Sequence, residues 1–377
     1  MLSILVVTTL VCVIAVIYPY VLYPLILAML PERPLNRGAI TAVNGSQFSL
    51  LFCAYNEAAS MPFKLANLKE LKIRYPQLEV LAFDDGSSDG TADIIADEAP
   101  FIRLIRGLGR NGKAHGMKLL AAAAKGEYLV FTDANVLLHA DSLDNLAACY
   151  ADYSVGGVCG ALHYLGTDES STAAVGGLYW RIEEKIKDLE SATGSVMGGD
   201  GSIFSIRSAL YPEYSDTVLD DFTVSMEVVF RNFRLIKSND VIAYERLVSV
   251  RSDEFSRKIR IAARAFHTHQ TFAKKRTALS PFDKFKYTSH KTLRWFGGGF
   301  LIVGCITAVI FSFLLYPPAG FTLATLTAAF FALGLSSSNG RLSAIAEIIL
   351  AMIATLVGIS RALRGQTFAV WNPAKSR

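Results

Sequence analysis

The sequence predicts an α/β fold in which a mostly parallel sheet forms a polar domain between apolar segments at the two ends of the chain. Two observations predict this arrangement. Between residues 45 and 278, short runs rich in branched and aromatic residues alternate with helical patterns, as in strands joined by crossover helices. The uncharged run Leu2–Leu30 and the apolar stretch from Phe296 onward are long enough to cross a bilayer.

The polar domain, residues 45–278, begins with a repeating order of strand and helix that is typical of a nucleotide-binding half-sheet. An amphipathic helix is predicted at Val175–Glu190, where apolar residues recur at helical spacing between charged ones. Predicted strands are Phe48–Cys53, Glu79–Phe83, Ile102–Arg106, Tyr128–Thr132 and Gly157–Tyr164, and predicted helices are Met61–Arg74, Ala92–Ala99, Ala114–Lys125 and Leu143–Tyr150.

The ends of the chain predict a multi-pass membrane protein. Residues 1–31 are expected to anchor the chain, and residues 300–360 to form two or three transmembrane helices. Arg33 and Arg37 follow the first apolar run, so the positive-inside rule places the polar domain in the cytosol. A basic juxtamembrane segment, 279–299, precedes the last helices, and the basic tail, 361–377, favours an even number of C-terminal crossings. The candidate spans are Phe300–Tyr316, Phe321–Leu335 and Leu342–Ile359.

The cysteine pattern and the net charge bear on the compartment and the partners of the protein. The five cysteines are scattered, with neither metal spacing nor a disulfide framework, which suits a reducing compartment. A net charge of +4 is too small to indicate nucleic-acid binding.

Two carboxylates, Asp84 and Asp85, end an apolar strand and enter a glycine-rich turn. Burial without partners would be costly, so they are either solvated or placed to bind a ligand. Open α/β sheets bind ligands at this end of their strands. Asn56 and Glu57 follow the first strand, and Gly112-Lys113 opens a helix whose N-terminus favours a diphosphate.

Two further acidic positions complete the candidate site. Asp133 and Asn135 carry oxygens two residues apart after the strand Tyr128–Thr132, and they can share a hard cation with phosphate oxygens. Asp220 and Asp221 open a helical pattern, where a carboxylate either caps the helix or serves as a general base. The segment Gly198-Gly199-Asp200-Gly201 allows close approach of backbone to a ligand, with an irregular loop as the alternative.

The order and spacing of these motifs resemble glycosyltransferase family 2, whose enzymes have the GT-A fold. The resemblance covers residues 48–270, and the flanking apolar segments suit the membrane-bound branch that makes poly-N-acetylglucosamine, chitin, hyaluronan and cellulose. The matching runs in that branch are LDDFTVSMEVVFRNFRL, VIAYER, EFSRKIRIAARAF and the terminal Trp371-Asn372-Pro373.

This resemblance implies an inverting transferase that moves a sugar from a UDP-sugar to a polyprenyl-linked or growing exopolysaccharide acceptor at the inner membrane of a bacterium. It assigns catalysis to Asp221 with Asp220 beside it, and binding of Mg²⁺ or Mn²⁺ to Asp133 with Asn135. Uridine and phosphate contacts fall to Asn56, Glu57, Asp84, Asp85 and Lys113, and the acceptor side to Gly199, Asp200, Gly201 and Arg264.

The chain departs from the branch at one motif. Processive synthases carry Q-x-x-R-W, and here the aligned stretch is Ile261-Ala262-Ala263-Arg264-Ala265. Loss of Gln and Trp favours single addition, while a processive synthase that secretes its polymer, as a homo-oligomer or with other polysaccharide-assembly proteins, stays open. A non-catalytic scaffold that only binds sugar nucleotide is the third hypothesis.

Overall fold

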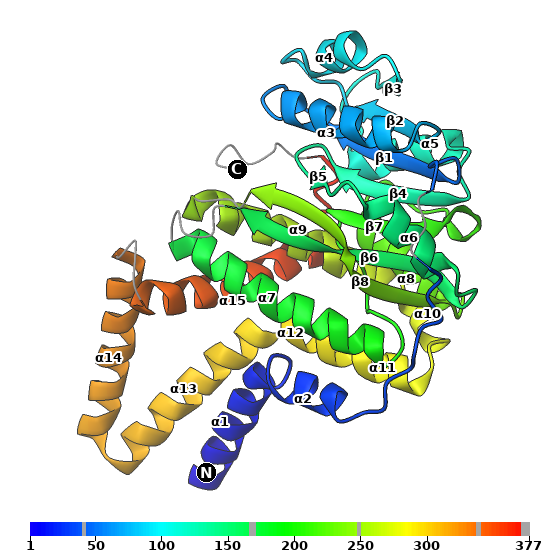
Figure 1. The fold of residues 1–377 in the computed structure, drawn as a ribbon. Coiled ribbons are helices and arrows are strands. Elements are labelled where there is room, and N and C mark those ends of the chain that lie inside the picture. The colour runs from blue at the N-terminus through cyan, green and yellow to red at the C-terminus, as the bar shows by residue number, and fades with distance from the viewer. Residues whose placement is uncertain (40–42, 166–170, 247–249, 337–340, 371–377) are drawn as a thin grey trace.

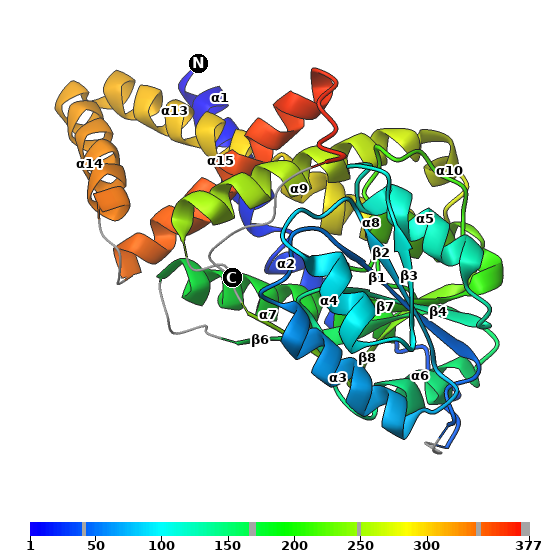
Figure 2. The same ribbon diagram turned by 90° about the horizontal axis from the view of Figure 1, so that it is seen from above.

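The computed structural model describes residues 1–39, 43–165, 171–246, 250–336 and 341–370. An eight-stranded sheet forms the centre of the polar domain, in the order β3-β2-β1-β4-β7-β6-β8-β5. Helices cover both faces of the sheet, while α1 (Leu2–Ile17), α13 (Gly297–Leu315) and α14 (Pro317–Ser336) project from one side of the domain (Figure 1, Figure 2).

The N-terminal half of the sheet confirms the predicted alternation of strands and helices. Its strands are parallel to one another and are connected by the helices α3, α4 and α5, while α6 follows β4 and leads to β6. The elements are β1 (Phe48–Ala54), α3 (Met61–Arg74), β2 (Glu79–Asp84), α4 (Thr91–Glu98), β3 (Ile102–Arg106), α5 (Lys113–Ala123), β4 (Tyr128–Asp133) and α6 (Ser142–Tyr150).

The C-terminal half of the sheet is mixed, while four of the seven strand pairs in the whole sheet are parallel. Strand β7 (Ile203–Arg207) runs antiparallel to both of its neighbours, β4 and β6 (Val155–Leu165). Strand β8 (Arg234–Arg246) is parallel to β6 and antiparallel to the short β5 (Leu137–Leu138). Strand β7 lies beside β4 and runs in the opposite direction, so β7 begins where β4 ends. The glycine-rich loop before β7 therefore lies at the edge of the sheet that carries the other predicted motifs.

Two apolar cores lie on opposite faces of the sheet. On one face α3, α4 and α6 bury residues such as Leu65, Ile95 and Leu146 against the strands. On the other face α5, α8 (Asp220–Phe230) and α9 (Arg251–Thr271) bury Met117, Met226 and Ala263. The predicted amphipathic helix is confirmed and slightly longer, as α7 (Ser171–Ala192).

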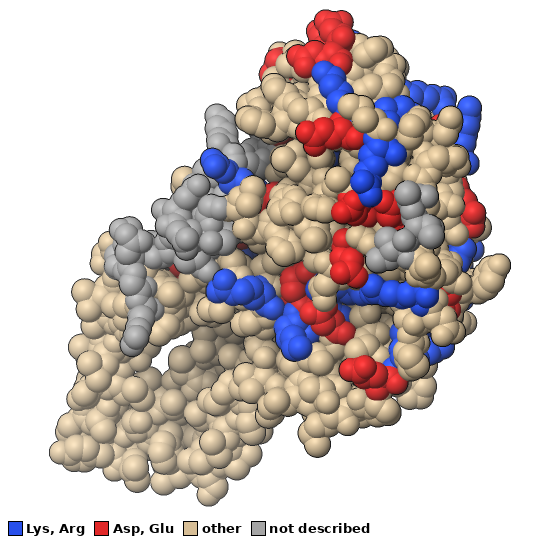
Figure 3. All heavy atoms as spheres, viewed as in Figure 1, with Lys and Arg blue, Asp and Glu red and all other residues tan. Residues whose placement is uncertain are grey.

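Three described helices are long and apolar enough to cross a membrane: α13, α14 and α15 (Arg341–Leu363). The predicted N-terminal span is broken instead, because α1 and α2 (Leu22–Ala28) meet at an angle of 56°. Pro19 lies between them, and a proline both lacks an N–H donor and clashes with the preceding turn. The projecting helices show no charged side chains on the face drawn in Figure 3, whereas charges gather over the α/β domain.

Short helices join the domain to these apolar segments. Helix α10 (Ala273–Thr277) follows α9. After it come α11 (Pro281–Tyr287), a π-helical turn η2 (Thr288–Thr292) and α12 (Leu293–Trp295), which together occupy most of the predicted juxtamembrane segment. A 3₁₀ turn, η1 (Ser208–Leu210), follows β7. Helix α15 lies along α9, where Gly358 fits closely against the backbone of Ile259.

Candidate active site

The predicted motifs meet at one edge of the sheet because the strands that carry them are parallel and in register. Ala54 at the end of β1 pairs with Asp84 at the end of β2, and Cys53 pairs with Asp133 at the end of β4. The residues that follow these strands therefore lie side by side. This is the edge at which open α/β sheets bind ligands.

Asn56 and Glu57 are bound to the turn that follows β2. Asn56 has a positive φ of 50°, its N–H donates to Ser87 Oγ at 3.0 Å, and its side-chain oxygen accepts from Ser88 N at 2.9 Å. The backbone N–H of Glu57 donates to Thr91 Oγ1 at 2.9 Å. These contacts fix the two turns to each other, so the predicted nucleoside-binding residues form one rigid wall.

Asp85 is a buried anchor for the turn before α5. Its carboxylate is 4 % exposed and accepts hydrogen bonds from Asn111 N at 2.7 Å and from Gly112 N at 3.0 Å. Arg110 lies 3.3 Å from the same carboxylate and stacks over the ring of Tyr55, 3.2 Å from its centroid. Asp85 thereby positions the backbone that leads directly into Lys113.

Asp84 is equally buried but is not fully engaged. One carboxylate oxygen accepts from Ser87 N at 3.2 Å. The other, Oδ1, is buried and has no hydrogen-bond partner among the described residues. A buried carboxylate oxygen in that state is costly unless a ligand supplies a donor.

Lys113 forms the centre of the site. Its Nζ lies 2.5 Å from Asp133 Oδ1 and 3.8 Å from Asp220 Oδ2. Burial would lower the pKa of Lys113, but Asp133, Asp220 and Asp221 together outweigh it and raise that pKa well above the usual value. The lysine is therefore a permanent cation that joins the end of β4 to the start of α8.

Asp221 has an environment suited to proton transfer. Burial and the neighbouring Asp220 raise its pKa to about 7, although Lys113 and the hydrogen bond from Phe222 N oppose the shift. A carboxylate with a pKa near the working pH is an effective general base. Asp220 is more buried than Asp221 and faces Lys113 and Arg264.

Gly201 lies between these charged groups. A Cβ at this position would be 2.8 Å from Lys113 Nζ, 3.1 Å from Asp221 Oδ2 and 3.6 Å from Asp133 Oδ2. The backbone N–H of Gly199 donates to Ser225 Oγ at 2.7 Å, and this hydroxyl donates to the carbonyl of Asp221 at 2.6 Å. The glycine-rich loop is thus packed against the acidic start of α8.

Arg264 and Asp200, both predicted on the acceptor side, are engaged with the protein itself. Arg264 is 2 % exposed, donates to the carbonyl of Val218 at 2.6 Å and lies behind Asp220. Asp200 accepts from Ser202 N at 3.2 Å and pairs with Lys187 at 2.7 Å. Direct contact of either side chain with an acceptor stays a prediction.

Asp133 and Asn135, the residues predicted to hold a metal, each contact a protein side chain in the structure. Asn135 donates to Glu245 Oε1 at 3.1 Å, and burial, opposed by Arg257, raises the pKa of Glu245 to about 7. Among the described residues no group of three or more His, Cys, Asp or Glu could hold a metal by itself. The oxygens of Asp133 and Asn135 do fit Mg²⁺ or Mn²⁺ if a diphosphate completes the coordination shell.

Three features of the site escape reasoning from the sequence. Glu245 lies within the long strand β8, the stack of Arg110 on Tyr55 joins two separate loops, and Lys187 belongs to a helix that reads as ordinary surface. The run VIAYER places a glutamate next to the apolar residues of a strand, and this is the signal that could have found Glu245.

Comparison with known proteins identifies the fold. Residues 49–213 match the family described as Glycosyl transferase family 2. The mannosyltransferase PcManGT from Pyrobaculum calidifontis, in complex with GDP-Man and Mn²⁺, superposes with a TM-score of 0.72 over 96 % of this chain and 99 % of that chain, at 21 % identity. The α/β domain thus has the GT-A fold.

Two curated relatives share sequence with part of the chain. Both are poly-beta-1,6-N-acetyl-D-glucosamine synthases from Staphylococcus epidermidis, 30 % and 29 % identical over 119 residues. The match spans 29 % of this chain and 28 % of each relative's length.

Residues 49–213 thus match a family 2 glycosyltransferase domain, which confirms for this part of the chain the family that the sequence resembles.

Proposed function

We propose that the protein is an inverting glycosyltransferase that moves a sugar from a UDP-sugar to a polyprenyl-linked or growing exopolysaccharide acceptor at the cytosolic face of the membrane. One observation carries this proposal. Lys113, Asp133, Asp220 and Asp221, from three separate parts of the sequence, converge at the ligand-binding edge of the sheet.

The first half of the proposed mechanism is binding of the nucleotide. The wall formed by Asn56, Glu57 and the 84–91 turn receives the nucleoside, and the unpartnered oxygen of Asp84 accepts a hydrogen bond from it. Lys113 lies at the N-terminus of α5, so both the lysine and the helix end attract the diphosphate. Asp85 keeps this N-terminus in place through its two backbone contacts.

The second half is transfer. Asp221 removes the proton from an acceptor hydroxyl, whose oxygen then attacks the anomeric carbon. A new C–O bond forms as the bond to the diphosphate breaks, so an α-linked donor yields a β-glycoside. Lys113 stabilises the negative charge that the leaving diphosphate gains.

Asp133 and Asn135 are the residues that would hold Mg²⁺ or Mn²⁺. A bound divalent cation supplies positive charge that neutralises the diphosphate. The relation between Lys113 and Asp133 supports this role, since phosphate oxygens would draw the lysine away from Asp133 and leave that carboxylate open to the cation.

The sugar nucleotide itself is open to a direct assay. The curated relatives carry names that denote an N-acetylglucosamine polymer, while the structural relative was solved with GDP-Man. A membrane preparation of wild type and of Asp221→Asn should be offered UDP-linked and GDP-linked sugars, with Mn²⁺ or Mg²⁺. We expect one UDP-sugar to be consumed by wild type only; if neither protein consumes any donor while both bind UDP, the chain is a scaffold.

Single addition is proposed over processive synthesis. Ala265 occupies the position where processive relatives have Trp, so no aromatic ring is available there to lie under an acceptor sugar. The length of the product decides the matter: one sugar per acceptor supports single addition, and a ladder of products means a polymerase.

The positions of the last helices support a proposal for the membrane arrangement. The segment after α15 reaches the nucleotide side, where the carbonyl of Ala369 lies close to Gly112, and α13 also begins beside the domain. This supports a cytosolic C-terminal end with two crossings, α13 and α14. A cysteine at Tyr316 should react with a membrane-impermeant thiol reagent added outside, and one at Gln366 should not; the reverse labelling would refute this topology.

A further inference from the structure

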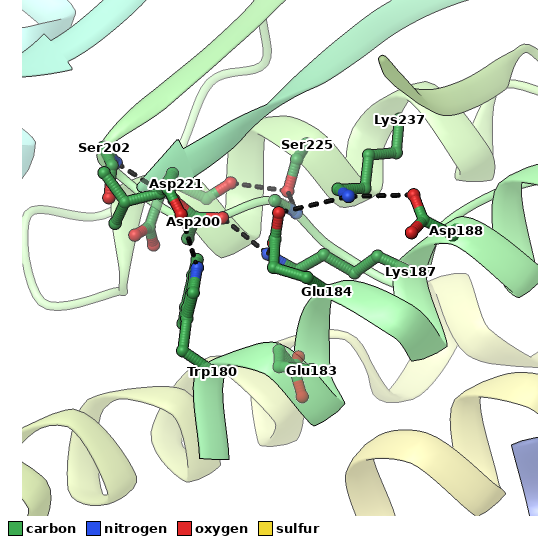
Figure 4. A network of polar contacts seen from close by, with 12 residues as sticks. Trp180, Glu183, Glu184, Lys187, Asp188, Asp200, Ser202, Asp221, Ser225 and Lys237 are labelled. Atoms are coloured by element: carbon green, nitrogen blue, oxygen red, sulfur yellow. Dashed lines mark hydrogen bonds and ion pairs between the residues drawn. The ribbon is translucent and has the colours of Figure 1, made fainter. Parts of the chain in front are cut away.

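The side chain of Asp200 contacts α7. Its Oδ2 lies 2.7 Å from Nζ of Lys187, and Oδ1 accepts from Ser202 N at 3.2 Å (Figure 4). Both oxygens therefore hold the glycine-rich loop in shape. One of them attaches it to α7, through Lys187.

Lys187 is a buried cation with a defined place in a charge network. Only 2 % of its side chain is exposed, and it pairs with Glu184 at 3.1 Å as well as with Asp200. Burial would lower the pKa of Lys187, but Asp200 and Glu184 outweigh it and raise that pKa well above the usual value. Its ammonium also lies over the ring of Trp180, 4.4 Å from the centroid, which restricts it further.

A second lysine shares the network without reaching the loop. Lys237 on β8 is equally buried and pairs with Glu184 at 3.1 Å and Asp188 at 2.8 Å (Figure 4). Its described ion pairs go to α7 alone. The two lysines thus match in charge, burial and partner Glu184, and differ in contact with Asp200.

The opposite side of the loop is attached to the proposed base. Gly199 N donates to Ser225 Oγ, which donates to the carbonyl of Asp221. Gly201 directly follows these two attachments, and a Cβ at this position would approach Lys113 and Asp221. A shift of Asp200 therefore changes the space in front of the Asp221 carboxylate.

Helix α7 is itself firmly held, so it can serve as the support. Glu183, next to Glu184, accepts from His290 at 2.9 Å and from Arg294 at 2.5 Å on the membrane-proximal segment. Burial would raise the pKa of Glu183, but Arg294 and His290 outweigh it and lower that pKa well below its usual range. Two adjacent glutamates of α7 thus make separate links. Glu183 contacts η2 and α12, and Glu184 contacts Lys187 and Lys237.

We propose that Lys187 is a positioning residue, which holds Asp200 so that the Gly199–Gly201 backbone sets the place of the acceptor hydroxyl in front of Asp221. The proposal rests on the proposed function and extends it to a residue outside the nucleotide and metal positions. Because misplacement by about 1 Å can slow a reaction about 100-fold, loss of this attachment should affect transfer far more than donor binding.

The test compares Lys187→Met with Lys187→Arg and with the matched control Lys237→Met, each as the full chain in membranes. UDP affinity with Mn²⁺, donor hydrolysis by water and sugar transfer to acceptor are measured separately. We expect Lys187→Met to lower transfer at least tenfold, raise the acceptor KM and raise the ratio of hydrolysis to transfer. UDP affinity should stay within about twofold, and Lys187→Arg should recover part of the transfer.

Two results would overturn the proposal. One is an equal change of the hydrolysis-to-transfer ratio in Lys187→Met and Lys237→Met, which means that the network supports the fold only. The other is a parallel fall in UDP affinity and transfer. If Lys187→Met does not accumulate, Asp200→Asn serves in its place, and an unchanged ratio in that variant refutes the role; absence of any transfer by wild type refutes the proposed function instead.

Discussion

Two Asp-Asp pairs lie at this site, and their surroundings give them different chemistry. Asp84-Asp85 ends a strand, and Asp85 accepts backbone N–H groups from the turn before α5. Asp220-Asp221 begins a helix, and Asp221 accepts one N–H, from its neighbour Phe222, while Asp220 repels its charge. The same dipeptide thus anchors a turn where backbone donors surround it, and where they do not it provides the carboxylate that we propose as the base.

The comparison extends to the other member of each pair, Asp84 and Asp220. One carboxylate oxygen of Asp84 is buried and has no hydrogen-bond partner among the described residues. A bound nucleoside can supply the missing donor. Asp220 faces the cations Lys113 and Arg264 at 3.8 and 3.7 Å. The chemistry of each carboxylate thus depends more on the hydrogen-bond donors and cations around it than on its position at the end of a strand or the start of a helix.

The largest expected effect is that of Asp221→Asn. Removing a general base should lower kcat by about 10²–10⁴-fold while UDP affinity stays near that of wild type. The folded chain keeps the Asp221 proton up to about pH 7, whereas the unfolded chain loses it near 3.8, so ionisation destabilises the fold as pH rises through this window.

At pH 8 the Asn variant should therefore unfold at the same temperature as wild type or a higher one. Single-turnover kinetics check the expected loss of kcat, and thermal unfolding of the same preparation checks the expected unfolding temperature. Weaker UDP binding in Asp221→Asn than in Asp85→Asn would reverse the roles of the two pairs.

Asp85→Ala should have the opposite signature. It leaves the buried N–H of Gly112 and the N–H of Asn111 without their acceptor, at a cost of about 1–3 kcal/mol each when water cannot reach them. We expect a lower unfolding temperature and UDP affinity reduced about tenfold, since the turn that presents Lys113 loosens. Asp85→Asn keeps one acceptor oxygen, so its UDP affinity and its unfolding temperature should lie between those of wild type and Asp85→Ala. Titration with UDP and thermal unfolding measure the two quantities.

The smallest effect concerns the pH profile of Asp220→Asn. In wild type, kcat/KM should rise with pH as Asp221 loses its proton and level off above about pH 7. Because the charge of Asp220 contributes to the raised pKa of Asp221, its removal should move this acid limb to lower pH. A limb that stays in place would show that Asp221 is not the titrating group.

Much of the N-terminal half of the domain could be predicted from the sequence. Helix α3 has the predicted bounds, and β3 does as well, because apolar periodicity and local turn residues define such elements. The convergence of Asp84 and Asp133 also follows, since parallel strands end at the same edge.

The rest depends on contacts that periodicity does not record. Insertion of β7 between β4 and β6 reverses the strand direction, and nothing in the run Ile203–Arg207 specifies its neighbours. The division of Leu2–Leu30 into two helices could have been read from Pro19, because proline cannot continue a helix from within. Lys187 gave no signal, since a lysine on an amphipathic helix is ordinarily solvated. The motif Trp371-Asn372-Pro373 lies outside the described residues.

The fit between Gly112 and Ala369 has a consequence for biosynthesis. A ribosome makes the turn before α5 when less than a third of the chain exists, but the segment that packs against it emerges only near the end. The parallel strands can form early, while the turn before α5 gains its contact with Ala369 only after the apolar helices α13 and α14 have been made. If α13 and α14 cross the bilayer as proposed, this contact at the proposed donor site forms only after both crossings have been synthesised.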